Sequence, residues 1–194
     1  MTVDECSETA EEPLRPLRLA RLLALKERWL RETGWKTCTR GTVRFQVRGD
    51  IFHAQFSTAA QGLLKLLIDP MHRMQWDRSV IEMDTIDVLS PTELVQRTIQ
   101  QNCLVRERVE YVALAEAAGK TALVAQSVKK ERSEQAQVHC FAVELTQHTV
   151  EVTSKIDWRL PPKQFSAQDL FQAFQSWVCS FQTALSNNHF LYLA

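Results

Sequence analysis

The stretch from Ser166 to Asn187 is the part of the sequence that most constrains the fold. Its apolar residues recur at intervals of three and four, which places them on one broad face of a helix: Leu170, Phe174, Trp177, Val178, Phe181 and Leu185. Ser166 and Asp169 have the spacing of a capping box at the start of this helix. A helical face with this much aromatic bulk needs a large apolar surface to cover it. We expect that surface to be the concave side of a β-sheet.

The segments before this helix predict such a sheet. Alternating apolar residues indicate two strands around Thr42–Arg48 and Phe52–Phe56, joined by a turn at Gly49-Asp50, and Trp35–Arg40 is a candidate for a short strand before them. Six more strands are predicted at about 80–89, 92–101, 106–115, 121–130, 136–146 and 149–158. Short connections favour antiparallel pairing. The predicted fold class is therefore α+β, with one curved antiparallel sheet closing around the last helix.

Two further helices are predicted in the N-terminal half of the chain. Between Leu14 and Thr33 the apolar residues recur at helical spacing among Arg and Lys, and Gly34 is placed to end the helix. A shorter helix is predicted from Thr58 to Ile68, where Asp69-Pro70 is expected to stop it.

Length, charge and cysteine use limit the classes of protein that the chain can belong to. At 194 residues it fits one domain over 14–194, preceded by an acidic, flexible segment over 1–13. The 23 basic and 23 acidic residues give no net charge, which argues against a nucleic-acid partner. The acidic N-terminus argues against a secretory signal, and no apolar run reaches the length of a membrane span. Five scattered cysteines are typical of a reducing compartment, so we expect a cytoplasmic location.

Four short motifs occur in an order that is similar to a known family. Arg73-Met74-Gln75-Trp76-Asp77 gives R-x-x-W-D ahead of a strand. Arg106-Glu107 follows at a strand start, Ser127-Val128 at the end of the next strand, and Asp157 with Leu160-Pro161 before the C-terminal helix. Together with the strand count, this set resembles the START family, the lipid-transfer domains related to steroidogenic acute regulatory protein. The resemblance covers about Gly34 to Asn187. The last motif is shorter than the family's version and lacks its Gly, so the subfamily and the ligand stay open.

The resemblance implies a helix-grip fold with an internal hydrophobic cavity that is gated by the C-terminal helix. It implies a non-enzymatic protein without a cofactor that binds one lipid and transfers it within the cell, with transient membrane contact. Sterol, phospholipid and ceramide-like ligands all remain open. Two alternatives are an enzyme of the wider helix-grip superfamily, such as a polyketide cyclase, and a ligand-free interaction module whose pocket is filled by its own side chains.

Strand alternation and the helical face together select the candidate ligand-binding residues. Val152 and Ser154 share one face of the last strand, while Arg97 shares the parity of its apolar neighbours and so is expected to point inward. The full set is Val95, Arg97, Ile99, Tyr111, Val152, Ser154, Phe174, Trp177 and Phe181. A buried guanidinium needs a partner, so we expect Arg97 and Tyr111 to form the polar end of the pocket, with Glu107 as a candidate partner. A bulge would reverse this parity and place Arg97 in solvent.

One loop and one motif have alternative interpretations. Cys103, Leu104 and Val105 form an apolar hairpin tip, which suggests a membrane-contacting or gating loop, or else a loop that folds back onto the C-terminal helix. Trp76 is expected to anchor the turn into the sheet, with Asp77 paired to Arg73 in a structural role. The histidines are too far apart in the sequence to suggest a metal site, and no catalytic residue is predicted.

Overall fold

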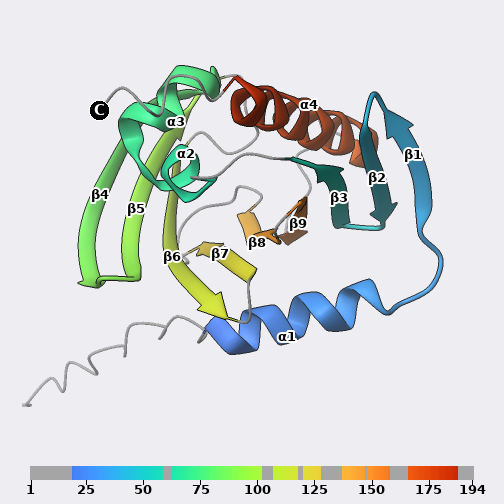
Figure 1. Cartoon of the computed structure of the whole chain (residues 1–194), viewed down its shortest axis with the longest axis horizontal. Coiled ribbons are helices and arrows are strands. Elements are labelled where there is room, and N and C mark those ends of the chain that lie inside the picture. The colour runs from blue at the N-terminus through green and yellow to red at the C-terminus, as the bar shows by residue number, and fades with distance from the viewer. Residues whose placement is uncertain are drawn as a thin grey trace, which may run out of the picture.

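A computed structural model describes residues 19–58, 63–101, 107–117, 120–127, 137–146, 148–157 and 166–187. Within these ranges one large antiparallel sheet carries four helices (Figure 1). The first three strands are β1 (Lys36–Arg40), β2 (Val43–Arg48) and β3 (Ile51–Ser57). The other six are β4 (Val80–Ser90), β5 (Glu93–Gln100), β6 (Glu107–Ala117), β7 (Lys120–Ser127), β8 (Gln137–Leu145) and β9 (Thr149–Asp157). All nine strands predicted from the sequence are present, and the predicted α+β fold class is confirmed.

Neighbouring strands in the sheet are consecutive in the chain except at one place, where β9 lies next to β3. The sheet runs β1-β2-β3-β9-β8-β7-β6-β5-β4, so the last strand lies between β3 and β8. Seven residue pairs join β3 to β9, from Ile51 opposite Lys155 to Ser57 opposite Thr149. This pairing connects residues about a hundred positions apart and joins the N-terminal hairpins to the meander of β4 to β9.

The helix α4 (Ala167–Ser186) lies across the concave face of the sheet, as its apolar stripe predicts. Ser166 is its N-cap: the Ser166 hydroxyl accepts a hydrogen bond from the backbone N–H of Asp169, and the Asp169 carboxylate accepts one from the N–H of Ser166. The stripe packs on Phe45, Phe52 and Phe56 of the neighbouring strands. The predicted capping box and the buried face of α4 are therefore confirmed.

Asp69-Pro70 starts a second helix, whereas the sequence analysis predicted only the end of the first helix at this place. The helix α2 (Leu63–Ile68) ends just before it, and α3 (Pro70–Trp76) starts at Pro70. The Asp69 carboxylate accepts hydrogen bonds from the backbone N–H groups of Met71 and His72, while Pro70 occupies the first helical position, where no N–H is needed. The helix that begins at Pro70 carries Arg73 and Trp76 to the concave side of the sheet.

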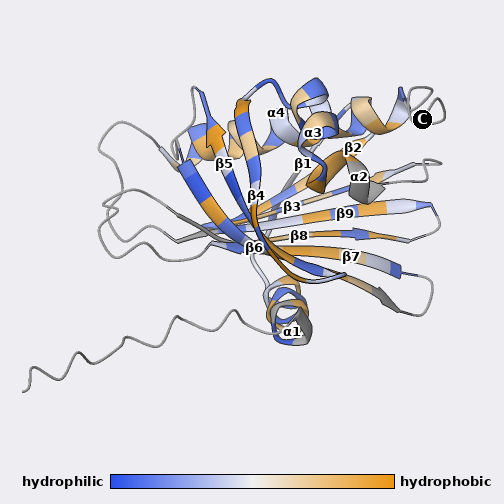
Figure 2. Cartoon of the chain, turned by 90° about the vertical axis from the view of Figure 1, so that its left-hand side faces the viewer, coloured by the Kyte–Doolittle hydropathy of each residue, from blue (hydrophilic) through white to orange (hydrophobic). Residues whose placement is uncertain are grey.

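The helix α1 (Leu19–Leu30) packs on the opposite, convex face (Figure 2). Its residue Trp29 forms a small core with Ile51, Val124 and Ala142 of three strands. Lys26 is buried in this contact, and its ammonium group is 2.5 Å from the Glu144 carboxylate and 3.5 Å from that of Glu151. A buried ion pair thus holds α1 to the back of the sheet.

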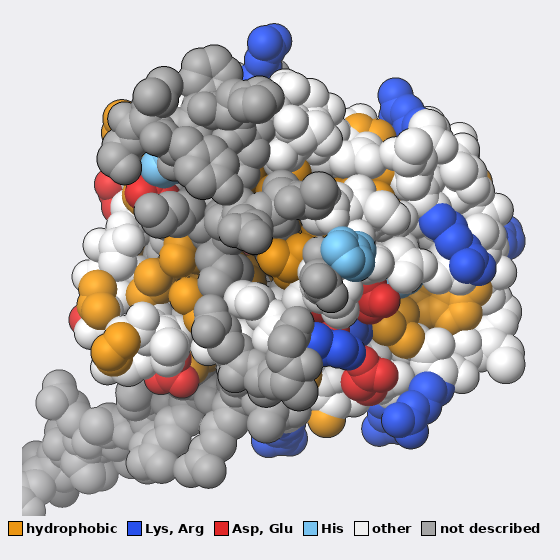
Figure 3. Space-filling view, in the orientation of Figure 1, with side chains coloured by type: hydrophobic (Ala, Val, Ile, Leu, Met, Phe, Trp, Pro, Cys, Tyr) orange, Lys and Arg blue, Asp and Glu red, His pale blue; other side chains and the backbone are white. Residues whose placement is uncertain are grey.

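The strand β4 is an exposed edge of the sheet and carries three register shifts against β5. The residues skipped at these shifts are Ile81, Ile86 and Leu89, and all three are exposed, as is Val88. Hydrophobic side chains accordingly reach the surface on the left of Figure 3, where Figure 1 places this edge. Bulges of this kind twist an edge strand away from regular pairing with another sheet.

Candidate functional site

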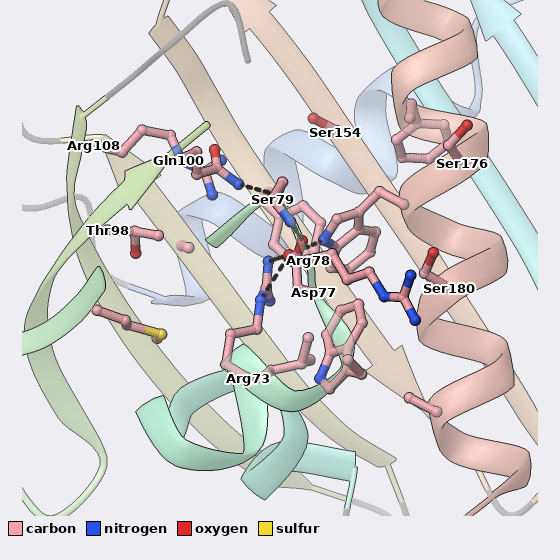
Figure 4. Close-up of a pocket in the computed structure, with 18 of the residues that line it drawn as sticks. Arg73, Asp77, Arg78, Ser79, Thr98, Gln100, Arg108, Ser154, Ser176 and Ser180 are labelled. Atoms are coloured by element: carbon pink, nitrogen blue, oxygen red, sulfur yellow. Dashed lines mark hydrogen bonds and ion pairs between the residues drawn. The ribbon is translucent and has the colours of Figure 1, made fainter. Parts of the chain in front are cut away.

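A cavity of about 860 Å³ lies between the concave face of the sheet, α4 and the α2–α3 pair (Figure 4). This volume is within the roughly 300–1,000 Å³ typical of small-molecule sites. Residues of β3 to β9, of the three helices α2, α3 and α4, and of the turn between α3 and β4 line it. The space beneath Phe174 and Trp177 is therefore hollow, which is the feature on which the lipid-binding interpretation depends.

One side of the cavity is apolar. Side chains from several strands and from α4 form this wall: Phe52, Val112, Leu123, Ala125, Phe141, Leu170, Phe174 and Trp177. The Trp177 ring makes an edge contact with Phe141 at 5.1 Å and stacks on Phe181 at 5.3 Å between ring centroids. These contacts fix the orientation of the rings that face the cavity.

The other side of the cavity is polar because of the inward faces of β5 and β6. Gln96, Thr98 and Gln100 are the buried residues of β5, and Arg108 and Glu110 are their neighbours on β6. The amide of Gln96 donates to the carbonyl of Ile68 at 2.6 Å, and the amide of Gln100 donates to the Ser79 hydroxyl at 3.0 Å. These amide donors are thus satisfied inside the protein, as buried polar groups require.

Arg73 and Asp77 form a buried ion pair at the wall shared by α3 and β4. Oδ2 of Asp77 accepts from Nε and Nη2 of Arg73 at 3.0 and 2.7 Å and from the Trp177 indole N–H at 2.9 Å. Oδ1 accepts from the backbone N–H and the hydroxyl of Ser79 at 3.2 and 2.6 Å. The pair joins α3, the start of β4 and the middle of α4, so the predicted pairing of Asp77 with Arg73 is confirmed.

The surroundings of this pair decide the charge state of both groups. Burial raises the pKa of Asp77, but the charge of Arg73 and hydrogen bonds from Ser79 and Trp177 outweigh it, so the pKa lies below its usual value. Burial lowers the pKa of Arg73, Asp77 raises it, and the nearby charge of Arg108 lowers it. The guanidinium also lies 4.7 Å from the ring centroid of Trp76 and 5.1 Å from that of Trp177. Both groups are charged at neutral pH, and the Arg73 cation is shielded by aromatic rings.

Three of the predicted ligand-binding residues line the cavity: Ser154, Phe174 and Trp177. Val152 and Phe181 lie on the predicted faces but are fully buried in the packed core, outside the cavity lining. The prediction that these side chains of β9 and α4 point to the concave side of the sheet is therefore confirmed.

The predicted orientation of the β5 and β6 residues is wrong. Val95, Arg97, Ile99 and Tyr111 lie on the convex side of the sheet, because the polar residues of β5 and β6 line the cavity instead. Arg97 is in ion pairs with Glu82 at 2.8 Å and with Glu107 at 3.0 Å, so the predicted partner is correct but the pair is at the surface. No reversal by a bulge is involved, since the β5–β6 register is regular.

Tyr111 shares this convex face and is buried there. Burial and a hydrogen bond to Glu93 raise the pKa of its hydroxyl to about 12. Tyr111 faces Val95 across the β5–β6 ladder, so the two residues lie side by side on the side of the sheet opposite the cavity.

The remaining predictions about the site concern the hairpin tip and metals. Cys103, Leu104 and Val105 lie outside the described residues, so their gating role stays a prediction. Among the described residues, no group of three or more His, Cys, Asp or Glu side chains is placed to hold a metal ion. Within the same ranges, no helix combines the length and apolar character needed to cross a membrane.

Sequence reasoning missed the polar wall as part of the site. Gln96, Thr98 and Gln100 are the polar set opposite Val95 and Ile99, which is the pattern of a solvent-facing side, and Arg108 and Glu110 continue it on β6. One feature of the sequence could have indicated a buried polar wall: these three residues of one strand carry amides and a hydroxyl but no charge, which is unusual for a solvent-exposed face.

Comparison with known proteins supports the fold. No family model matches the sequence, and neither does any protein in a search of curated proteins. Three human structures are similar in fold: the lipid transfer and protein localization domain of StarD13 (DLC2), STARD10, and StAR-related lipid transfer protein 5. Their TM-scores are 0.63, 0.70 and 0.63 at 15%, 14% and 16% identity. The matches cover 87%, 90% and 88% of this chain and 98%, 82% and 95% of those chains, respectively. The chain has the helix-grip fold of the START domains.

Proposed function

We propose that the protein binds a single lipid in the cavity under α4 and transfers it between membranes without enzymatic chemistry. The observation that carries this proposal is the hollow of about 860 Å³ between the aromatic face of α4 and the sheet. Burying roughly 400 Å² of apolar ligand surface at about 25 cal/mol/Å² contributes about 10 kcal/mol before the costs of association. That is enough to hold a lipid non-covalently.

The two other interpretations are less well supported by the geometry. An interaction module with a self-filled pocket does not need a cavity of this size. An enzyme needs a free acid–base pair, whereas the carboxylates in the described lining, Asp77 and Glu110, each lie beside an arginine. The proposal also includes the expected cytoplasmic location and transient contact with membranes.

Within this proposal, Ser154, Phe174 and Trp177 contact the ligand, and α4 moves to admit it. Such a motion has to break the hydrogen bond from Trp177 to Asp77, which attaches the middle of α4 to the α3–β4 turn. The hydrogen bond from Gln182 to Thr42 holds α4 to the β1–β2 hairpin on its other side.

The test is to block the cavity. Val112→Trp places an indole among the lining residues, and Val88→Trp places the same group on the exposed part of β4 as the matched control. We expect lipid bound during expression, identified by native mass spectrometry and extraction, to be lost with Val112→Trp and retained with Val88→Trp. Circular dichroism and the thermal midpoint check that both variants fold. Wild-type protein that neither carries lipid nor takes it up from vesicles would contradict the proposal.

A further inference from the structure

One donor group on the polar wall has no partner. Nε of Arg108 is buried and finds no hydrogen-bond acceptor among the described residues. Its neighbours differ in this respect, because the side-chain amides of Gln96 and Gln100 both donate hydrogen bonds within the protein. A buried N–H of a charged group without an acceptor is costly, so a partner supplied from outside would stabilise it.

Glu110 does not satisfy this group. Its carboxylate is 3.6 Å from Nη1 of Arg108, on the terminal side of the guanidinium, and leaves Nε free. Arg108 extends from β6 toward the middle of the cavity in Figure 4, on the side where Ser79 and Gln100 lie. Thr98, directly opposite Arg108 on β5, also lines the cavity and brings a hydroxyl next to it.

The charges around the cavity favour an anion at this place. The described lining contains three arginines, at positions 73, 78 and 108, and two carboxylates, at 77 and 110, and the excess positive charge is that of Arg78, whose side chain is exposed. Burial is the main cause that lowers the pKa of Arg73, and the charge of Arg108 lowers it as well, because two nearby guanidinium groups repel each other. An anion beside Arg108 would reduce that repulsion.

We propose that Arg108 receives the anionic headgroup of the lipid, a carboxylate or a phosphate, through its free Nε. The inference depends on the proposed function, because it names the class of ligand that the same cavity takes. The headgroup lies inside the protein against β5 and β6, and the acyl chain extends toward Phe141, Leu123 and Phe174 on the apolar wall.

The test compares ligands that differ only in headgroup charge. The probes are cis-parinaric acid and its methyl ester, measured directly by fluorescence, and phosphatidate and diacylglycerol of equal chain length, measured as competitors. We expect the wild-type protein to bind at least one anionic member about tenfold more tightly than its neutral partner, as a charge-assisted hydrogen bond implies. The pair that shows the preference identifies the headgroup as carboxylate or phosphate.

Substitutions test whether Arg108 causes the preference for anionic over neutral lipids. Arg108→Gln keeps a polar side chain of similar length and should abolish the preference, while Arg97→Gln makes the same change on the convex face of the adjacent strand and should retain it. Arg108→Lys keeps the charge without the Nε donor and should restore only part of the preference. Thermal unfolding shows whether each variant folds.

The outcomes separate the two proposals. Equal affinity for charged and neutral members in the wild type, or a preference that survives in Arg108→Gln, overturns the role of Arg108 and leaves lipid binding intact. A wild-type protein that binds none of the four lipids overturns the headgroup site. The proposed function fails as well only if the same protein carries no lipid in native mass spectrometry and takes none up from vesicles.

Discussion

Replacing Asp77 with Asn should destabilise the protein strongly, because Asp77 is the common acceptor of three segments. Its carboxylate takes hydrogen bonds from Arg73, Ser79 and Trp177, and only 4% of Asp77 and 7% of Arg73 are exposed. Asn keeps the shape but removes the negative charge, and its NH₂ group must face one of these donors. The Arg73 cation is then buried without a counter-ion, which costs about 3–5 kcal/mol.

The measurement is urea-induced unfolding at pH 7, followed by circular dichroism. Asp84→Asn is the matched control, because Asp84 lies on β4, the strand that follows Asp77, with an exposed side chain, and its change should cost less than about 1 kcal/mol. Adding Arg73→Met to Asp77→Asn removes the unpaired cation and should recover at least part of the lost unfolding free energy.

The pH dependence gives an independent check of the same reasoning. Because the pKa of Asp77 in the folded state lies below its usual value of 3.8, its contribution to stability is complete above that value and is lost as the pH falls through the folded pKa. The difference between wild type and Asp77→Asn should therefore shrink in acid. A loss below about 1 kcal/mol at pH 7, or a difference that does not change with pH, would refute the argument.

Three further predictions concern the Lys26 ion pair, the Tyr111 hydroxyl and the N-cap of α4. Lys26→Met leaves the Glu144 carboxylate buried without its cation and should lower the unfolding free energy by about 3 kcal/mol, whereas Arg21→Met on the exposed side of α1 should have little effect in the same urea titration. Since the pKa of Tyr111 is raised from 10.0 to about 12, wild-type stability should fall by roughly 2–3 kcal/mol relative to Tyr111→Phe between pH 10 and 12, and parallel curves would contradict this. Ser166→Ala removes the N-cap of α4 and should cost about 1 kcal/mol by thermal unfolding, and an unchanged midpoint would count against the capping box.

The sequence predicts most of the fold because period and turn residues determine strands and helices locally. The stripe of α4 and the alternation of Val152 and Ser154 in β9 correctly indicate which side chains face the concave side. Both elements lie against apolar neighbours on that side, so hydrophobicity and burial agree there.

The same rule fails in β5 because the interior next to that strand is a partly polar cavity. Gln96, Thr98 and Gln100 are buried against this cavity, and Val95 and Ile99 lie half-buried on the other face. Alternation identifies two faces of a strand, but it assigns the inner face correctly only where the interior is apolar. A similar limit applies to Asp69-Pro70, which has the residues of a helix stop and of a helix start, and only the hydrogen bonds of Asp69 distinguish the two.

The cavity depends on the position of β9 in the sheet. Among the strands that the structure describes, this one is the last to be synthesised, yet it lies between β3 and β8 and pairs with both. Until it is in place, the hairpins of β1 to β3 and the meander of β4 to β8 are separate sheets, each with an unpaired edge, and α4 has no continuous surface to cover. The cavity thus forms only when β9 has joined the two parts of the sheet, and a nascent polypeptide that stops short of β9 has no cavity to fill.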